Sequence, residues 1–288
     1  MGARCAVVAL LLWAATAGAQ DRFFDSAGVR LRYVEQGAGQ PVVLLHGFTA
    51  ELERAWIQTG VLHELARDHR VIALDLRGHG ASDKPRDARA YDEVALDVIR
   101  LLDHLGIERA HAVGYSLGGI ILARLLASHE QRFLSVVLAA AAYRRSRSER
   151  ADREAEAAAR EIEEHGVYRA LAVSTAPTDE AAPDEEAIRL RSRAIALYND
   201  RFAMAALMRA RRALLVTDEQ FAAVRVPVLA VVGSADPQAT RVIAMQRMWP
   251  AVRIEVVPGA THPTGHPRSL IRRPELVAAI RQHIAQRP

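Results

Sequence analysis

Cysteine is nearly absent from this chain of 288 residues, which contains only Cys5. That residue lies in the apolar run Cys5–Ala15, which follows one positive charge and precedes an A-x-A site at residues 17–19. The pattern is typical of a secretory signal peptide, so we expect residues 1–19 to be removed by cleavage after Ala19. The mature chain would then have no cysteine, which excludes disulfide bonds, thiolate catalysis and cysteine-ligated metal.

A hydrophobic run long enough to span a membrane is also missing from the N-terminal segment, because a span needs about 20 apolar residues. We therefore expect a secreted or periplasmic protein without stable membrane insertion. Lysine is scarce as well: Lys84 is the only one, and 38 lysines and arginines face 34 aspartates and glutamates. This near balance gives little support for a nucleic-acid partner. The expected partner is a small molecule, with no metal or cofactor.

Strand-like and helix-like segments alternate up to about Ala142. The apolar runs expected to form buried parallel strands are Pro41–Leu45, Val71–Leu74, Ala110–Val113 and Leu134–Leu138. Before them, apolar residues at 29, 31 and 33 alternate with Arg30 and Arg32, which predicts an edge strand with one solvent-facing side. The clearest amphipathic helix ends at Gly106. This alternation predicts an α/β fold, a doubly wound and mostly parallel sheet with helices on both faces.

The sequence pattern changes over residues 143–217, where charged helical stretches replace the strand-like runs. Strands then return at 226–232 and 253–257, followed by a last helix from Pro274 to about Ala285. We expect residues 20–142 and 218–288 to form the core, and residues 143–217 to form a helical cap or lid inserted before the last two strands. Positive and negative charges in this insert nearly balance. Apolar side chains are therefore expected to shape the pocket, and they are Phe202, Met204, Leu207 and Met208.

Ser116 lies in a G-x-S-x-G sequence, Gly114 to Gly118, at the junction of a strand-like and a helix-like segment. A serine on such a sharp turn needs neighbours without a Cβ, so that its Oγ projects clear of the sheet. The following helix directs its N-terminus at the hydroxyl, where the backbone N–H of Leu117 can stabilise an oxyanion. Ser116 is the candidate nucleophile.

Two loops downstream supply a base and a group that orients the base. Asp236 follows the strand that ends near Val232, and His262 follows the strand that ends near Val257. Both lie beyond the carboxyl ends of strands, in the chain order Ser, Asp, His that this type of site requires. His266 is the rival base.

A second oxyanion donor is expected after the strand Pro41–Leu45, where His46-Gly47-Phe48 turns sharply and presents the Phe48 backbone N–H. His46 is expected to brace this loop. The glycine-rich loop Asp75–Ser82 is expected to be structural, with Asp75 pairing locally with Arg77.

Together, these five motifs resemble the α/β-hydrolase fold superfamily. The resemblance covers nearly the whole mature chain except the divergent insert. It implies Ser116 as nucleophile, His262 as base, Asp236 as the residue that orients it, and the Phe48 and Leu117 N–H groups as the oxyanion hole. The chain departs from epoxide hydrolases and haloalkane dehalogenases, which use an aspartate at the position of Ser116. It also departs from the usual pattern in having Pro263 directly after the histidine.

The expected function is that of a serine hydrolase, which cleaves a carboxylic ester or lactone through an acyl-enzyme. The alternatives are a carbon–carbon bond hydrolase of a diketone-like acid, which uses the same triad, and a ligand-binding member of the fold without turnover.

Overall fold

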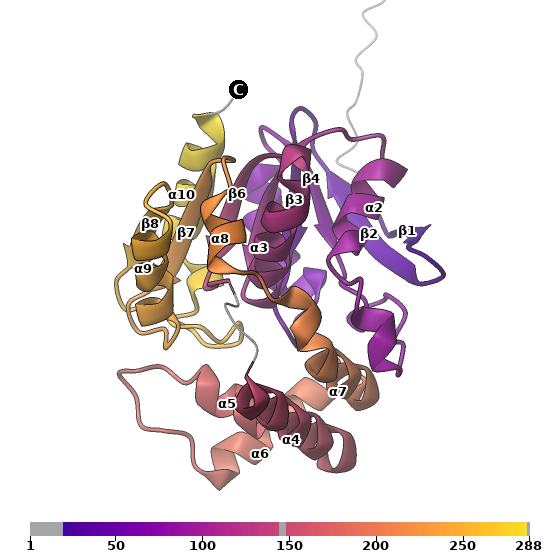
Figure 1. The fold of residues 1–288 in the computed structure, drawn as a ribbon, viewed down its shortest axis with the longest axis vertical. Coiled ribbons are helices and arrows are strands. Elements are labelled where there is room, and N and C mark those ends of the chain that lie inside the picture. Colours follow the sequence, from indigo (N-terminus) through magenta and orange to yellow (C-terminus); the bar gives the residue numbers. More distant parts are fainter. Residues whose placement is uncertain (1–19, 144–147, 287–288) are drawn as a thin grey trace, which may run out of the picture.

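The computed structural model describes residues 20–143 and 148–286, so the predicted signal peptide lies outside the described residues. One eight-stranded sheet, in the order β1-β2-β4-β3-β5-β6-β7-β8, runs through the molecule (Figure 1). Its strands are β1 (Arg22–Asp25), β2 (Arg30–Gln36), β3 (Pro41–Leu45), β4 (Arg70–Leu74), β5 (Ala110–Tyr115), β6 (Phe133–Ala139), β7 (Val228–Gly233) and β8 (Arg253–Val257). β1 pairs antiparallel with β2, and β2 pairs antiparallel with β4, whereas all the other neighbours in the sheet are parallel. The predicted fold class is confirmed.

The alternating segment forms β2, but the prediction that it is a solvent-facing edge strand was wrong. β1 pairs with it and takes the edge. Arg32 is only 8% exposed, because its guanidinium is held by carboxylates that include Asp75. A buried and paired arginine gives the same alternation as an exposed one, so the pattern alone does not distinguish them.

Helices cover both faces of the sheet, in two apolar layers. On one face pack α2 (Leu96–His104), α3 (Leu117–His129), α8 (Asp218–Ala222) and α9 (Ala239–Met248). On the other pack α1 (Val61–Leu65) and α10 (Pro274–Ala285). Short 3₁₀ and π turns complete the core, η1 (Glu53–Ile57), η2 (Ala88–Tyr91), η3 (Glu130–Arg132) and η5 (Leu270–Arg272). The strand ends that carry the candidate residues therefore stand on a frame that is packed from both sides.

Gly106 ends α2 as predicted, with a φ of +65°. Its N–H donates to Asp103 O, and the N–H of Ile107 donates to Leu102 O. This pair of bonds is the Schellman arrangement, which satisfies carbonyls that the helix end leaves free.

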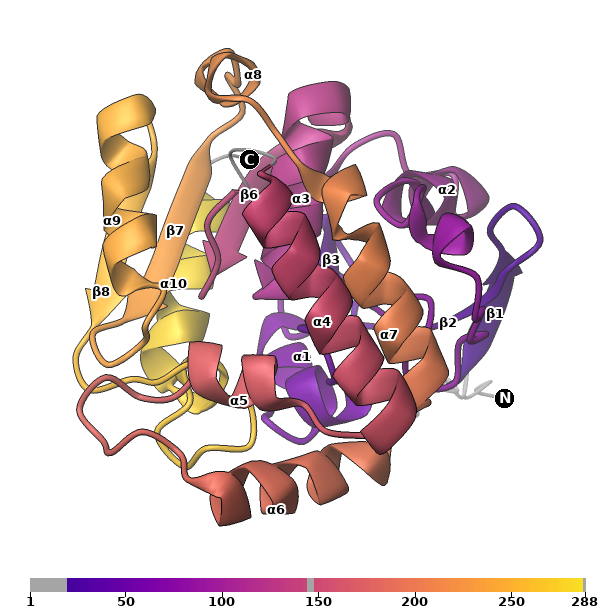
Figure 2. The same ribbon diagram turned by 60° about the horizontal axis from the view of Figure 1, so that its bottom comes forward.

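Between β6 and β7 the structure describes α8 and four further α-helices, and these four gather at one end of the molecule (Figure 1). They are α4 (Glu149–His165), α5 (Arg169–Ser174), α6 (Glu185–Ala196) and α7 (Arg201–Arg209), followed by the 3₁₀ turn η4 (Ala210–Leu214). α4 and α7 lie side by side (Figure 2). The side chains of Ser148, Asp184 and Asp200 cap the N-termini of α4, α6 and α7, which fixes where these helices begin.

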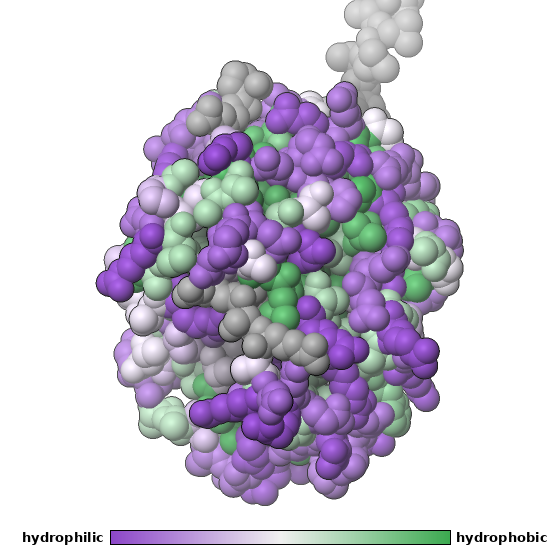
Figure 3. Space-filling model, viewed as in Figure 1, coloured by the Kyte–Doolittle hydropathy of each residue, from purple (hydrophilic) through white to green (hydrophobic). Residues whose placement is uncertain are grey.

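We call this group of helices, residues 148–217, the insert. It has a small apolar cluster of its own, which joins Ile162 of α4 to Met204 of α7, and its visible outer surface is mostly hydrophilic (Figure 3). A role for it as a lid stays a prediction. Across residues 20–143 and 148–286, no helix is both long enough and apolar enough to cross a bilayer.

Candidate active site

Ser116 occupies the turn between β5 and α3, with the left-handed backbone angles φ 52° and ψ −109°. Such a conformation costs a non-glycine residue about 1–3 kcal/mol. The surrounding backbone holds it in place, since the Ser116 N–H donates to Ala139 O at 2.8 Å and the Ser116 carbonyl accepts from Ile120 N at 3.0 Å. The turn therefore has the strained form expected of a strand-to-helix nucleophile elbow.

Glycines make this turn possible because a backbone passes close to each. A Cβ on Gly118 would lie 2.2 Å from Leu45 O, and one on Gly114 would lie 2.4 Å from the Gly118 carbonyl carbon. Both distances are too short for a real Cβ, so any residue other than glycine would clash at these positions. The start of α3 therefore requires glycine at both.

The loops after β7 and β8 bring Asp236 and His262 to this turn. His262 Nε2 lies 2.9 Å from Ser116 Oγ, and His262 Nδ1 lies 2.9 Å from Asp236 Oδ2. Asp236 is 1% exposed and His262 is 7% exposed. A carboxylate only accepts, so Nδ1 carries the proton and donates to Asp236, which leaves the Nε2 lone pair facing the serine hydroxyl.

The pose of His262 is set from the strand that carries the serine. The Tyr115 hydroxyl donates to the His262 carbonyl oxygen at 2.6 Å, and burial raises the pKa of Tyr115, which keeps this donor protonated. The bridge between Thr261 and Ser269 holds the same loop on its other side. These contacts hold His262 within reach of Ser116 although Pro263 follows it directly. The contact of Tyr115 was not predicted from the sequence, although its place directly before Ser116 was the available signal.

His266, the rival base, points elsewhere. Its Nδ1 lies 3.1 Å from Thr261 Oγ1, and its Nε2 lies 3.2 Å from Glu180 of the insert. Among the described residues it makes no hydrogen bond to Ser116, so the geometry favours His262.

The two expected oxyanion donors lie on adjoining segments. The loop after β3 passes directly against the serine, since a Cβ on Gly47 would lie 3.3 Å from Ser116 Cβ. Gly118 N–H donates to His46 O at 3.1 Å, which ties the start of α3 to this loop. Within residues 20–143 and 148–286, no acceptor is bonded to the backbone N–H of Phe48 or Leu117. Both N–H groups are available to a ligand.

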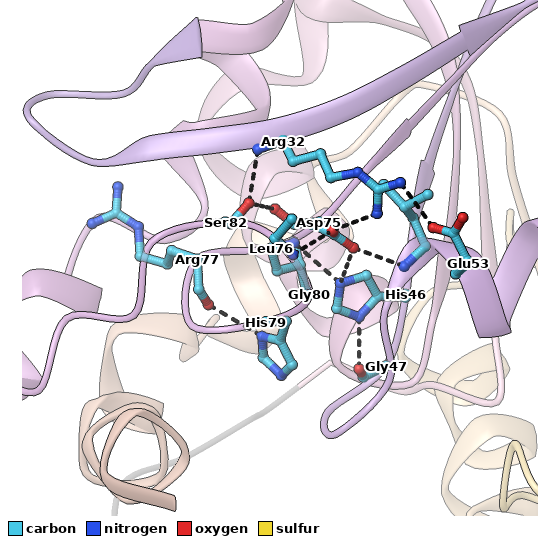
Figure 4. Close-up of polar contacts among 12 residues, drawn as sticks. Arg32, His46, Gly47, Glu53, Asp75, Leu76, Arg77, His79, Gly80 and Ser82 are labelled. Atoms are coloured by element: carbon cyan, nitrogen blue, oxygen red, sulfur yellow. Dashed lines mark hydrogen bonds and ion pairs between the residues drawn. The ribbon is translucent and has the colours of Figure 1, made fainter. Parts of the chain in front are cut away.

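Two buried histidines, His46 and His79, hold this loop and the segments next to it (Figure 4). His46 Nε2 accepts from Leu76 N–H at 3.1 Å, and His79 Nε2 accepts from Thr49 N–H at 3.3 Å. Burial lowers the pKa of His46 and lowers that of His79 well below its ordinary value, so both rings remain neutral acceptors. The expected bracing role of His46 agrees with these contacts.

Asp75 anchors the same region, but the expected pairing with Arg77 was wrong. Asp75 accepts from Leu52 N–H at 2.8 Å and Ala81 N–H at 2.9 Å, and it pairs with Arg32 at 3.1 Å (Figure 4). Arg77 turns away to the buried Asp97. The two partners are distant in sequence, which is why local spacing did not reveal them.

A cavity of about 230 Å³ opens onto Ser116 and His262. Apolar side chains from α3 and from the insert make up much of its wall, among them Leu207 and Met208. Phe202 and Met204, which were also expected there, lie elsewhere: Met204 belongs to the insert's own cluster, and Phe202 stacks under Arg86. In the described part of the chain, no group of three or more His, Cys, Asp or Glu side chains is placed to hold a metal ion.

Comparison with known proteins identifies the family. A family model for the alpha/beta hydrolase fold matches residues 40–264. The chain is 42% identical over 123 residues to the dihydrolipoyllysine-residue acetyltransferase component of an acetoin cleaving system from Cupriavidus necator, a match that covers 42% of this chain and 32% of that protein. It is 39% identical over 115 residues to a 2-hydroxymuconate semialdehyde hydrolase from Pseudomonas sp. (strain CF600), which covers 39% of this chain and 40% of that one.

These matches span less than half the length of either relative. A thermophilic esterase from Thermogutta terrifontis superimposes with a TM-score of 0.74 over 93% of this chain and 99% of its own, at 23% identity, which shows a shared fold alone. The family match itself extends from β3 through Ser116, Asp236 and His262. On this evidence the chain belongs to the alpha/beta hydrolase fold family.

Proposed function

We propose that this protein is a serine hydrolase that cleaves a carboxylic ester or lactone of a small molecule through an acyl-enzyme. The observation that carries the proposal is the continuous chain of hydrogen bonds from Ser116 Oγ through His262 to Asp236, both of 2.9 Å, at the wall of a cavity. A serine hydroxyl becomes a useful nucleophile when a positioned base takes its proton.

In the first half-reaction, Ser116 Oγ attacks the ester carbonyl carbon while its proton passes to His262 Nε2. The carbonyl oxygen becomes an oxyanion that accepts from the Phe48 and Leu117 N–H groups, each worth about 3 kcal/mol in the transition state. The carbon–oxygen bond to the alcohol then breaks, and His262 returns the proton to the leaving oxygen. Asp236 stays ionised and stabilises the imidazolium.

In the second half-reaction, a water takes the place of the alcohol. His262 Nε2 accepts a proton from the water as it attacks the acyl carbon, and the bond to Ser116 Oγ breaks with return of that proton. The carboxylic acid is released and the serine is restored.

A carbon–carbon bond hydrolase is the second candidate, because a relative of 39% identity is named a 2-hydroxymuconate semialdehyde hydrolase. A binding protein without turnover is the third. Turnover of a short p-nitrophenyl ester supports the first proposal, whereas cleavage of a diketone acid with no ester turnover supports the second.

A fluorophosphonate probe tests the nucleophile directly. We expect one label on the peptide that contains Ser116, and none in Ser116→Ala. A label elsewhere, or an equal label in the variant, contradicts the assignment. A wild-type protein that neither reacts with the probe nor turns over either substrate favours the binding protein.

We also propose export, on the basis of the A-x-A site at residues 17–19. Intact-mass analysis of protein from the periplasm or medium should show a chain that begins at Gln20. A chain recovered from the cytoplasm with Cys5 still attached contradicts this.

A further inference from the structure

One cation in the wall of the cavity lacks an acidic partner. Arg211 lies in η4, at the end of the insert, and lines the same cavity as Ser116 and His262. Among the described residues, the one hydrogen bond of its side chain is to the thioether sulfur of Met208, at 3.2 Å. No carboxylate of residues 20–143 or 148–286 forms an ion pair with it within 4.0 Å. Burial lowers the pKa of Arg211 and the charge of Glu154 acts in the opposite direction, but the Glu154 carboxylate forms its ion pair with Arg150.

A second cation from the core shares this cavity. Arg241, on α9, also lines it, and its Nη1 contacts Gln238 Oε1 at 3.3 Å. Both guanidinium groups line one cavity, and burial together with the charge of Arg241 lowers the pKa of Arg211. Two cations at an otherwise largely apolar wall are unfavourable unless an anion lies between them.

Some arginines of the insert are paired with carboxylates, whereas others, such as Arg191, have no carboxylate partner among the described residues. Arg209, two residues before Arg211, binds both Glu156 and Glu163, and Arg169 binds Glu161 and Glu185. The insert therefore does not lack acids to place beside an arginine. Within the described part of the chain, Arg211 is the arginine without a carboxylate partner that the insert places at the cavity of Ser116.

We infer that Arg211 and Arg241 bind a carboxylate of the substrate, so that the preferred ester or lactone carries a negative charge besides the bond that is cleaved. This inference rests on the proposed hydrolase function. A guanidinium presents paired donors that match the two oxygens of a carboxylate, and the anion relieves the repulsion between the two cations. The cavity of about 230 Å³ lies below the roughly 300–1,000 Å³ of sites for drug-sized ligands, which favours a short acid.

A matched pair of substrates tests the inference. Monoethyl succinate carries the carboxylate, and ethyl butyrate is a neutral ester of the same acyl length. The measured quantity is the ratio of kcat/KM for the charged ester to kcat/KM for the neutral one. The variants are Arg211→Gln, Arg241→Gln and, as control, Arg212→Gln, which changes the exposed neighbour in η4.

We expect the wild type to prefer the charged ester. Arg211→Gln should lower the ratio about 10- to 100-fold, the range for loss of a charge-assisted hydrogen bond, and Arg241→Gln should lower it less because that side chain is exposed. Arg212→Gln should keep the ratio within about twofold. A wild type without preference, or a ratio that survives in Arg211→Gln, overturns the inference.

Calorimetric titration with succinate separates this inference from the proposed function. Succinate should bind the wild type and Ser116→Ala alike, and Arg211→Gln about 10- to 100-fold more weakly. If neither ester is turned over, the hydrolase proposal fails while the titration still decides the carboxylate site. Absence of succinate binding to the wild type counts against the site even if esters are cleaved. Arg211→Met, checked for folding by circular dichroism, replaces Arg211→Gln should that variant not fold.

Discussion

The sheet side of the cavity and the insert side pair their polar groups in opposite ways. On the sheet side, hydrogen bonds join Ser116 to His262 and His262 to Asp236, and Asp75 accepts from both a backbone N–H and a side chain. On the insert side, the Arg211 guanidinium hydrogen-bonds only to the sulfur atom of Met208 among the residues that the structure describes. Mutual pairing holds groups in one geometry, whereas an unpaired charge is satisfied only when a ligand arrives. The first arrangement suits a reaction, and the second suits recognition.

The largest test of this contrast is removal of the base. His262→Ala should lower kcat by about 10⁴- to 10⁶-fold, as loss of a triad member does. His266→Ala is the control, because that ring contacts Thr261 and Glu180 and not the serine. Steady-state kinetics on a p-nitrophenyl ester measure both. An inactive His266→Ala beside an active His262→Ala reverses the assignment.

The free energy of unfolding should respond differently to a substitution on the sheet side and to one on the insert side. Asp75→Asn should lower the free energy of unfolding by about 3 kcal/mol, because it breaks a buried ion pair with Arg32. Arg211→Met should leave that free energy unchanged or raise it, since a partly buried cation without a carboxylate is replaced by an apolar chain. Urea denaturation measures both. A loss of similar size in the two variants removes the contrast.

Low pH should reduce the stability of the folded protein through the two buried histidines on the sheet side. Burial lowers the pKa of His46 and His79 from 6.5, so below pH 6.5 the unfolded chain binds protons that the folded chain refuses. Stability is therefore full above about pH 6.5 and falls as the pH drops toward the folded values, by up to about 1.4 kcal/mol per pH unit for each histidine. Urea midpoints between pH 7.5 and 5 should show this fall.

His79→Gln should flatten that pH dependence, because glutamine does not titrate. His165→Gln, at an exposed position in the insert, should leave it as in the wild type. Identical curves for all three proteins count against a role for the buried rings.

The smallest expected effect belongs to Tyr115. Tyr115→Phe removes the bond to the His262 carbonyl and should lower kcat by about 5- to 10-fold, the equivalent of one hydrogen bond of about 1 kcal/mol. Tyr91→Phe is the matched control, since its buried hydroxyl also donates to a carbonyl, that of Pro85. An equal fall in kcat for both variants indicates a general effect of losing a buried hydroxyl.

The positions of Ser116, Asp236 and His262 could be predicted from sequence because each follows a recognisable apolar strand. The carboxyl ends of parallel strands meet at one edge of the sheet, so residues far apart in the chain converge there. The short strand β1 was missed, since four residues give little periodic signal. The α5 helix, with six residues, was missed for the same reason.

Features that depend on a distant partner could not be predicted. Arg32 is buried only because Asp75 lies beside it after folding, and Tyr115 reaches a carbonyl 147 residues away. The state of Arg211 is harder still to foresee. Its sequence neighbours include Arg209 and Arg212, and only the packed structure shows which arginine finds a carboxylate and which faces the cavity.

The insert has helix caps and an apolar cluster of its own, which has a consequence for engineering. Its helices carry their own N-caps at Ser148, Asp184 and Asp200 and share a small apolar cluster of their own. Both of its chain ends join one sheet, between β6 and β7. We therefore expect that another helical segment grafted between the same two strands would alter what the cavity accepts and leave Ser116 in its place.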